Sequence, residues 1–378
     1  MRTAALALAV CASTLSCSAI LGLQEPVVDD SLEGGTTEGG EGGGEGGACG
    51  ASPCQPVLIT DDATLISPYD MLVGDDGYLY FTNGNADTGV KSVARVDKTA
   101  AGAQPEILID WTTHEGYPNQ IALGGGNFFF AVDSNVGNPY WGGGIVECPM
   151  TGCPQGQGLT RPNLSAYAVA SDGTHVVYAD DYTDGNFNDY YELKAGDTNL
   201  QNTQVLISDT NGEDVYYLDI DSSGNVYAAH DTGIYVCNVA GCGGAPTPLL
   251  GALEIEVNEV RVAGDRLYFT SAPLQGAASV QWVPLAGGQP TPVTTNVNFP
   301  LAVVVDDTYV YFTDVGNTNN PNDGRVVRCP RDGCGPSDAN AVTLSVGAAA
   351  GKNPRALAQD ATTLYWGTYT GQVWKVAK

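Results

Sequence analysis

The stretch PLAVVVDDTYVYFTD (residues 300–314) shows the pattern that decides the fold of this 378-residue chain. A proline opens a run of apolar residues, Asp and Thr follow, and a second run ends in an aromatic pair. Branched and aromatic residues favour strands, whereas Asp suits the turn between two strands. The stretch therefore predicts a β-hairpin of two short strands.

The same pattern recurs along residues 56–378, and a third and a fourth strand follow each copy, as in residues 279–284 and 291–294. A repeat of about 40–50 residues with four strands is the size of a propeller blade. We therefore predict an all-β propeller of seven four-stranded blades with few helices. The aromatic residues that anchor the seven copies are Tyr80, Phe130, Tyr178, Tyr227, Tyr268, Tyr311 and Tyr365.

The two ends of the body are expected to meet in one blade. The last copy stops at residues 372–376, which supply only a third strand. Residues 56–60 form an apolar run that precedes the first copy and can supply the missing outer strand. Pairing these segments closes the ring and removes an exposed sheet edge.

Three of the second strands carry a recognisable motif: 80–83 (YFTN), 311–314 (YFTD) and 365–368 (YWGT). They resemble the strands of YWTD-type and NHL-like propellers. Over residues 56–378 the chain resembles the propeller lipoproteins of bacteria, myxobacteria among them. YWTD propellers have six blades, so the likeness is to the repeat style. It implies a propeller fold but leaves the function open, because propellers serve many functions.

The first 16 residues are typical of an export signal, with Arg2 before a short apolar run at residues 4–10. This run is too short to span a bilayer. Residues 14–17 (TLSC) resemble a bacterial lipobox, although Thr14 stands where Leu is usual. We therefore predict that Cys17 is lipidated; the alternative is an ordinary secretory signal with an incidental cysteine.

Residues 17–50 are predicted to form a lipidated, acidic, Gly-rich linker, because the segment 39–47 carries no apolar side chain that could pack. Residues 51–378 then form a single propeller domain. By resemblance, Ser18 in place of Asp favours the outer membrane. We expect an exported protein of the cell envelope that contacts the membrane only through its lipid anchor.

The charge of the chain argues against nucleic acid as a partner. Lys and Arg total 15 against 43 Asp and Glu, a formal net charge of −28. Nucleic-acid binding depends on Lys and Arg neutralising phosphates. We expect a soluble, monomeric body whose partner is a protein or a glycan at one face of the propeller.

The cysteines of the body share one spacing, Cys-x4-Cys. In an exported protein such pairs favour disulfides. Zinc would need two pairs to converge, but the pairs fall in alternate blades. We predict local disulfides around the turn between the third and fourth strands. The four pairs are Cys49 with Cys54, Cys148 with Cys153, Cys237 with Cys242 and Cys329 with Cys334.

A candidate ligand site lies where the second strand of each blade ends. Asn and Asp gather there, and carboxylates around a central mouth could bind calcium, a sugar or a peptide; the same residue types also simply suit turns. The weak metal candidates are Asp181, Asp184 and Asp314, and no motif requires another cofactor. The predicted ring comprises Asn83, Asp133, Asp181, His230, Ser271, Asp314 and Thr368.

No motif marks the chain as an enzyme. The sequence has three histidines and no phosphate loop, G-x-S-x-G or H-E-x-x-H segment. The leading hypothesis is a non-catalytic binding or scaffolding module. The alternatives are a metal-dependent hydrolase or lyase with its site in the central mouth, and a purely structural envelope protein.

Overall fold

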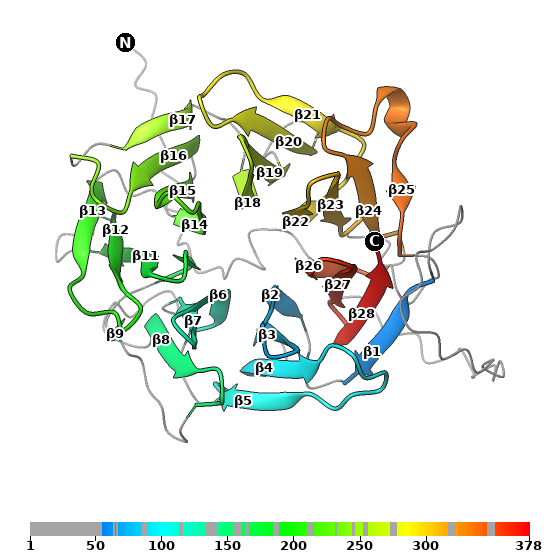
Figure 1. Cartoon of the computed structure of the whole chain (residues 1–378), viewed down its shortest axis with the longest axis horizontal. Helices are drawn as coiled ribbons and strands as arrows, with labels where there is room; N and C mark the ends of the chain where they lie inside the picture. The colour runs from blue at the N-terminus through cyan, green and yellow to red at the C-terminus, as the bar shows by residue number, and fades with distance from the viewer. Residues whose placement is uncertain are drawn as a thin grey trace, which may run out of the picture.

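The computed structural model describes residues 55–378, apart from gaps at 63–64, 66, 85–89, 113–115, 134–142, 154–160, 163–165, 184–188, 210–214, 231–232, 244–245, 252–255, 273–277, 317–322 and 346–351. The predicted signal segment and linker lie outside the described residues. Seven four-stranded antiparallel sheets surround a central axis (Figure 1). The prediction of a seven-bladed all-β propeller is confirmed.

Six blades take their strands from consecutive stretches of chain. Blade one has β2 (Pro68–Val73), β3 (Tyr78–Gly84), β4 (Lys91–Asp97) and β5 (Glu106–Asp110). Blade two has β6 (Pro118–Gly124), β7 (Asn127–Val132), β8 (Gly144–Pro149) and β9 (Arg161–Pro162). Blade three has β10 (Val169–Ser171), β11 (His175–Thr183), β12 (Asp189–Asp197) and β13 (Gln204–Asp209).

The remaining blades follow the same order. Blade four has β14 (Val215–Ile220), β15 (Asn225–His230), β16 (Gly233–Asn238) and β17 (Thr247–Gly251). Blade five has β18 (Glu256–Ala263), β19 (Arg266–Ala272), β20 (Ser279–Pro284) and β21 (Thr291–Thr294). Blade six has β22 (Pro300–Val305), β23 (Tyr309–Asp314), β24 (Arg325–Pro330) and β25 (Val342–Thr343).

Blade seven closes the ring. It has β26 (Pro354–Gln359), β27 (Thr363–Thr368) and β28 (Gln372–Ala377), and its outer strand is β1 (Val57–Asp61). Val57 pairs with Lys375 and Leu58 with Trp374 in antiparallel register (Figure 1). The predicted closure is therefore confirmed, and the edge of β28 is covered by the start of the domain.

The tyrosine of the repeated motif holds the turn between the first and second strands. In blade six, Asp306 Oδ1 accepts hydrogen bonds from the backbone N–H groups of Thr308 (2.9 Å) and Tyr309 (2.8 Å), while its other oxygen accepts one from Tyr311 Oη (3.0 Å). An aspartate that caps a turn in this way fixes the register of the hairpin. The same pairing recurs as Tyr80–Asp76 (2.6 Å), Tyr227–Asp221 (3.0 Å) and Tyr365–Asp360 (2.8 Å).

The threonine of the motif binds a backbone group that a bulge in the first strand leaves without a ladder partner. The register of β22 shifts between Pro300 and Val303, which leaves backbone groups without ladder partners. Thr313 Oγ1 accepts a hydrogen bond from Ala302 N (2.9 Å) and donates one to the carbonyl of Arg355 in the next blade (3.2 Å). The motif therefore joins neighbouring blades as well as the two strands of its own hairpin.

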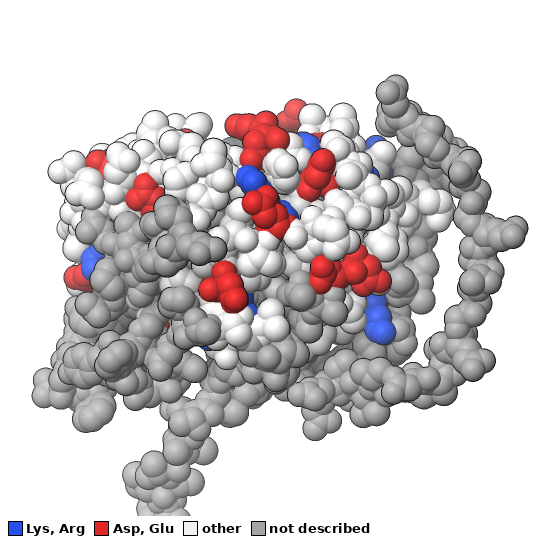
Figure 2. Space-filling model, turned by 90° about the horizontal axis from the view of Figure 1, so that it is seen from below, with Lys and Arg blue, Asp and Glu red and all other residues white. Residues whose placement is uncertain are grey.

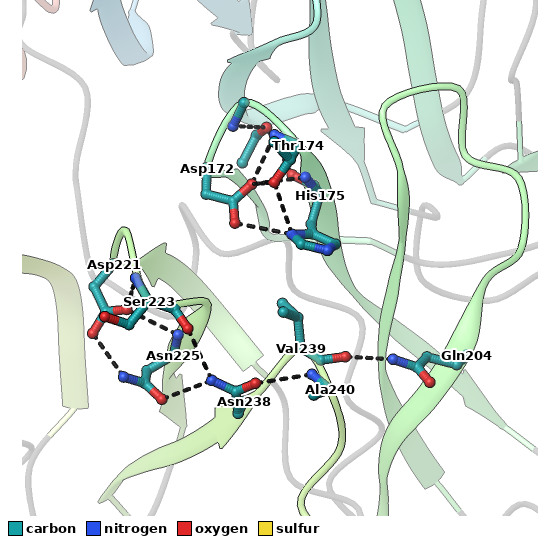
Figure 3. Close-up of polar contacts among 12 residues, drawn as sticks. Asp172, Thr174, His175, Gln204, Asp221, Ser223, Asn225, Asn238, Val239 and Ala240 are labelled. Atoms are coloured by element: carbon teal, nitrogen blue, oxygen red, sulfur yellow. Dashed lines mark hydrogen bonds and ion pairs between the residues drawn. The ribbon is translucent and has the colours of Figure 1, made fainter.

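Two of the turns show how far the motif can vary (Figure 3). In blade four, Asp221 caps Ser223 and Asn225, as expected. In blade three the tyrosine is absent, and His175 instead places its Nδ1 3.0 Å from Asp172 Oδ2 (Figure 3). Burial opposes ionisation of Asp172, but hydrogen bonds from His175 and Thr174 outweigh it and lower the pKa of Asp172 to about 2.

The strand register corrects the predicted ring of polar residues in blade two. Pro300 pairs with Asp314, and the corresponding Pro118 pairs with Val132. Val132 therefore holds the equivalent position, and the predicted member Asp133 lies one residue beyond it. The prediction took Phe130 as the anchor of this blade. The register instead gives that position to Phe129, the middle of three phenylalanines. A shift of one residue turns a side chain to the other face of a strand.

Blade three needs the same correction. Tyr178 takes the pairing position of Phe312, so Asp180, two residues further on, matches Asp314. The predicted member Asp181 lies one position beyond. The prediction placed Tyr178 at the first position of the motif. In this blade, however, valine stands at the first position and the tyrosine at the second. Lys194 forms an ion pair with Asp180, which is 3% exposed.

Three of the predicted cysteine pairs are joined in the structure: Cys148–Cys153, Cys237–Cys242 and Cys329–Cys334. The first cysteine of each pair lies on the third strand, β8, β16 or β24, and the second lies in the turn that follows, as predicted. Among the described residues, the one helical element is the 3₁₀ turn η1 (Pro336–Asp338) after the third pair.

The fourth predicted pair differs from these three, because the structure does not confirm it. Cys54 lies just before the first described residue, at position 55, and Cys49 lies further upstream. Both cysteines are therefore outside the described part of the chain. A disulfide between Cys49 and Cys54 stays a prediction that depends on the shared spacing alone.

Acidic side chains outnumber basic ones in this chain. Red carboxylate groups outnumber blue basic groups on the side shown in Figure 2, consistent with the net charge of −28. Within the described part of the chain, no helix has the length and apolar character needed to cross a membrane.

Candidate functional site

The first strand of each blade faces the axis of the ring, so β2, β6, β10, β14, β18, β22 and β26 surround a central channel (Figure 1). Two cavities lie along this channel. The lower cavity has a volume of about 300 Å³ and lies near the carboxyl ends of these strands, where Val73, Leu123 and Gln359 line it. The upper cavity measures about 110 Å³ and lies near their amino ends, beside Pro68 and Arg355. Both have mixed apolar and polar walls.

A polar layer lies between the two cavities. It consists of Asp70, Gln120, Tyr217, Asp219, Glu259 and Arg261. Arg261 Nε lies 3.0 Å from Glu259 Oε1, and its Nη2 lies 3.8 Å from Asp70 Oδ1. Arg261 also donates a hydrogen bond to Tyr217 Oη, which in turn donates one to Asp70 Oδ1 (3.2 Å). This chain of contacts links blades one, four and five across the channel.

Gln120 adds blades two and three to this layer. Its Nε2 donates a hydrogen bond to the carbonyl of Leu218 (2.7 Å). Its Oε1 accepts hydrogen bonds from the backbone N–H groups of Val169 (3.2 Å) and Leu218 (3.1 Å). The side chain is 2% exposed. One amide therefore satisfies three backbone groups of two other blades.

Burial sets the electrostatics of the layer. It raises the pKa of Glu259 to about 8, although the nearby Arg261 lowers it. Burial likewise raises the pKa of Asp70 and of Asp219, again against the effect of Arg261. A carboxyl group that leaves water favours its neutral form. The layer therefore carries one guanidinium among three acids that hold their protons more tightly than usual.

The acids of the layer are committed to the protein itself. Asp70 accepts hydrogen bonds from the backbone N–H groups of Met71 (2.8 Å) and Ile121 (3.0 Å). Asp219 accepts them from Ile220 (3.0 Å) and Val262 (2.6 Å). Such bonds hold the first strands in place, which favours a structural role for this layer.

The upper cavity is different, because tyrosines surround a cation there. Tyr69 is 46% exposed at its rim. The ring of Tyr216 lies in the wall and packs edge-on against Tyr167, with ring centroids 6.1 Å apart. Arg355 contributes a guanidinium to the same wall, and Glu256 contributes a carboxylate. A concave site with aromatic walls and a few charged groups is typical of ligand binding.

Arg355 pairs with no carboxylate in the described part of the chain. Its Nη1 donates a hydrogen bond to Ser67 Oγ (2.5 Å), and its guanidinium lies 5.2 Å from the centre of the Tyr369 ring. Burial lowers the pKa of Arg355, although the nearby Tyr69 and Tyr369 oppose this. Arginine remains charged in proteins, so the cavity wall carries a positive charge.

The predicted ring residues lie on the second strands, one strand away from the channel. Asp314 Oδ1 accepts hydrogen bonds from the backbone N–H groups of Asn298 (3.1 Å) and Phe299 (3.0 Å), and its Oδ2 lies 3.2 Å from Arg325 Nε. Neither channel cavity is lined by a ring residue. In this arrangement Asp314 fixes the loop that leads into β22.

The other described members contact groups of their own blade or, for His230, a side chain of blade three. Asn83 Nδ2 donates to Ser92 Oγ (3.2 Å), and the hydroxyls of Ser271 and Ser279 lie 2.9 Å apart. Further contacts pair Thr368 Oγ1 with Thr370 Oγ1 (3.1 Å), Asp133 Oδ1 with the Tyr117 N–H (2.7 Å), and the His230 ring edge-on with Tyr191 (5.1 Å). Burial raises the pKa of Asp133 to about 6. A ligand role for the ring stays a prediction.

For metal binding, no cluster of three His, Cys, Asp or Glu side chains that could hold an ion occurs among the described residues. Asp184 and the side chain of Asp181 lie outside the described part of the structure, so those two candidates stay predictions. The Asp314 carboxylate, as placed here, is bound to backbone N–H groups and Arg325.

The second strands do not line the channel, so a prediction made from them did not include the residues around it. The signal was a polar or charged residue where a sister blade has an apolar one. Arg355 follows the opening proline of its first strand, whereas Leu301 follows that of blade six. Likewise, Glu259 and Arg261 interrupt the apolar pattern of β18.

No protein-family model and no curated protein matches the sequence. Among solved structures, the computationally designed protein Ika8 is similar with a TM-score of 0.54 at 13% identity, over 85% of this chain and 100% of that one. A puromycin hydrolase mutant complexed with PGG gives a TM-score of 0.53 at 15% identity, over 79% of this chain and 48% of that one.

A prolyl endopeptidase structure gives a TM-score of 0.54 at 17% identity, over 82% of this chain and 46% of that one. The chain therefore spans about half the length of the two enzymes it is similar to. At such identities the likeness shows the propeller fold alone, because unrelated functions share a fold.

Proposed function

We propose that this chain is an exported, envelope-anchored propeller that binds a partner at the upper cavity without catalysing a reaction. The proposal rests on one observation. The cavity holds both Tyr69, which is 46% exposed, and Arg355, which has no acidic partner in the described residues. Aromatic and arginine side chains are the residues that contribute most to protein interfaces. The partner is a protein or a glycan of the envelope.

Binding at the upper cavity can be tested by site-specific photo-cross-linking of the full chain in its own envelope. A photoreactive residue at Tyr69 should give a discrete cross-linked product. The matched control places it at Val205 on the outer strand β13, which is 51% exposed but far from the channel. Identical cross-linking patterns at the two positions, or none at either, would refute a binding site at this cavity.

The anchor is proposed from the segment 14–17 and the linker that follows. It predicts that Cys17 carries an acyl chain, because a signal of this type ends at a lipidated cysteine. Labelling with an alkyne-tagged fatty acid should mark the wild-type chain and the control Cys11→Ser, but not Cys17→Ser. Equal labelling of both variants would contradict the assignment. Fractionation of the labelled protein would place it in the outer or the inner membrane.

A further inference from the structure

We infer that the upper cavity receives a carboxylate group of a protein partner, with Arg355 as its cationic counterpart. This inference rests on the proposed function of that cavity, which it extends by naming the chemistry of the ligand. Guanidinium binds carboxylate through two parallel hydrogen bonds, which gives both strength and orientation.

Two arginines border the cavities of the channel, and they differ in their partners. Arg261 contacts Glu259 at 3.0 Å and Asp70 at 3.8 Å. Arg355 reaches Ser67 Oγ and the face of Tyr369, which satisfy a small part of its hydrogen-bonding capacity. A guanidinium carries five N–H donors. The charge of Arg355 is therefore left for a group that the described chain does not supply.

The fold itself does not require a cation at this position. The first strands of blades six and seven are built alike: each opens with a proline and carries a bulge before the third residue beyond it. Leu301 stands in blade six where Arg355 stands in blade seven, and both line the upper cavity. Since the same backbone accepts leucine, the arginine has a role other than shaping the strand.

The size of the cavity favours a small anionic group. The cavity has a volume of about 110 Å³. A carboxylate on a short stem fits such a space. Tyr69 and Tyr216 can then pack against the stem at the rim.

The surrounding charge favours a monoanion. Glu256 and Glu259 line the same cavity, so a phosphate dianion would meet two acidic side chains. The chain as a whole carries a net charge of −28, which repels polyanions such as acidic polysaccharides. A single carboxylate on a protein, either a C-terminus or an Asp or Glu side chain, is the anion with the least repulsion.

Saturation-transfer NMR on the full chain can test this with small probes. N-acetylglycine represents a C-terminus, and N-acetylaspartate α-methylamide represents an acidic side chain. N-acetylglycinamide is the uncharged control, and glucuronate represents an acidic glycan. We expect one of the two peptide carboxylates to bind, N-acetylglycinamide not to bind, and glucuronate to bind more weakly than that carboxylate.

Two substitutions should move the binding in opposite directions. Arg355→Met should weaken the preferred carboxylate roughly tenfold or more, since a charge-assisted pair is lost. Glu256→Gln should strengthen it several-fold because a neighbouring negative charge is removed, a gain that a misfolded protein cannot imitate. Arg266→Gln, which alters an arginine at the start of β19 that pairs with Asp332 and lines neither cavity, should bind as the wild type does.

The inference is overturned if Arg355→Met binds the carboxylates as well as wild type does. It is also overturned if glucuronate binds more tightly than the peptide carboxylates, or if N-acetylglycinamide binds as well as they do. The proposed function has a separate test. If the cross-link from position 69 persists in the Arg355→Met chain, the binding site stands and the carboxylate inference fails. If no cross-link forms from position 69 in the wild-type chain, the proposed function itself fails.

Discussion

The polar layer and the upper cavity lie next to each other on the first strands, and each contains a half-buried arginine, but the two arginines differ in their partners. Arg261 is surrounded by Glu259, Asp70 and Asp219 and holds several blades together. Arg355 stands among tyrosines without a carboxylate partner in the described residues. The difference teaches that a paired charge in this channel links the blades, whereas the charge of Arg355 is the one that we propose for a ligand.

The largest effect on this comparison should come from removing the cation of the polar layer. Arg261→Met leaves buried acids without their partner and should lower the free energy of unfolding by about 3–5 kcal/mol. Urea unfolding at neutral pH measures this change. The control Arg266→Met breaks a pair with Asp332, whose side chain is 84% exposed, and should cost less than about 1 kcal/mol. Equal losses in the two variants would mean that the layer has no special role.

The next effect is a dependence of stability on pH. The pKa of Glu259 is about 8 in the folded chain against an ordinary value of 4.5, so the folded state binds more protons between these values. The free energy of unfolding should therefore fall as pH rises from about 4.5 to about 8. Asp133, with a pKa raised to about 6, contributes in the same direction over a lower range.

On the acid side the sign reverses. Burial opposes ionisation of Asp360, but Lys98 and backbone hydrogen bonds outweigh it and lower the pKa of Asp360 to about 2, and Asp172 behaves alike. Their contribution is complete above the ordinary value of 3.8 and is lost as pH falls toward 2. We expect the highest stability close to about pH 4. Urea midpoints from about pH 3 to 9 check this, and Glu259→Gln should flatten the slope above about pH 5; an unchanged slope would show that Glu259 is not its source.

A smaller loss should follow from replacing Gln120, the amide side chain of the polar layer. Gln120→Leu leaves the backbone groups of Val169 and Leu218 without their partner and should cost about 1–3 kcal/mol. Gln372→Leu is the control, because its amide bonds to Asp61 at the exposed edge of blade seven. It should change the free energy of unfolding by less than about 0.5 kcal/mol. If both substitutions are neutral, water replaces the lost contacts.

The sequence was sufficient for the architecture because each blade repeats its turn and its strand pattern. Alternating apolar residues and the turn aspartates predicted seven blades and the closure through β1, and the cysteine spacing predicted the pairs in blades two, four and six. The same spacing also predicted a bond from Cys49 to Cys54, which the described residues do not reach.

Register within a blade was harder to predict than the number of blades. In blades two and three the aromatic anchor moved by one residue, so Asp133 and Asp181 were placed one position too far along their strands. Neighbouring aromatic or apolar residues offer two equally good anchors, and strand pairing alone distinguishes them.

The channel could not be predicted in the same way. Asp70, Gln120 and Arg261 come from blades one, two and five, and their contacts depend on the ring geometry rather than on any local motif. A comparison of first strands across the repeats would have singled out Arg355 against Leu301. It could not have shown that Arg261 contacts carboxylates whereas Arg355 contacts none among the described residues.

The smallest expected effect tests the comparison from its other side. Arg355→Met removes a half-buried charge that has no acidic partner among the described residues, so the folded chain no longer bears the cost of taking that charge partly out of water. We expect the free energy of unfolding to stay the same or to rise by up to about 1 kcal/mol, while carboxylate binding is lost. Functional residues often reduce stability in this way.

Thermal unfolding of wild type, Arg355→Met and Tyr69→Ala decides the point. Tyr69 is 46% exposed, so Tyr69→Ala should leave the midpoint almost unchanged and shows the scatter expected for a rim substitution. If Arg355→Met instead loses as much stability as Arg261→Met, then Arg355 is a structural residue like its neighbour. The contrast between the two regions would then disappear, because both cations would be holding the ring together.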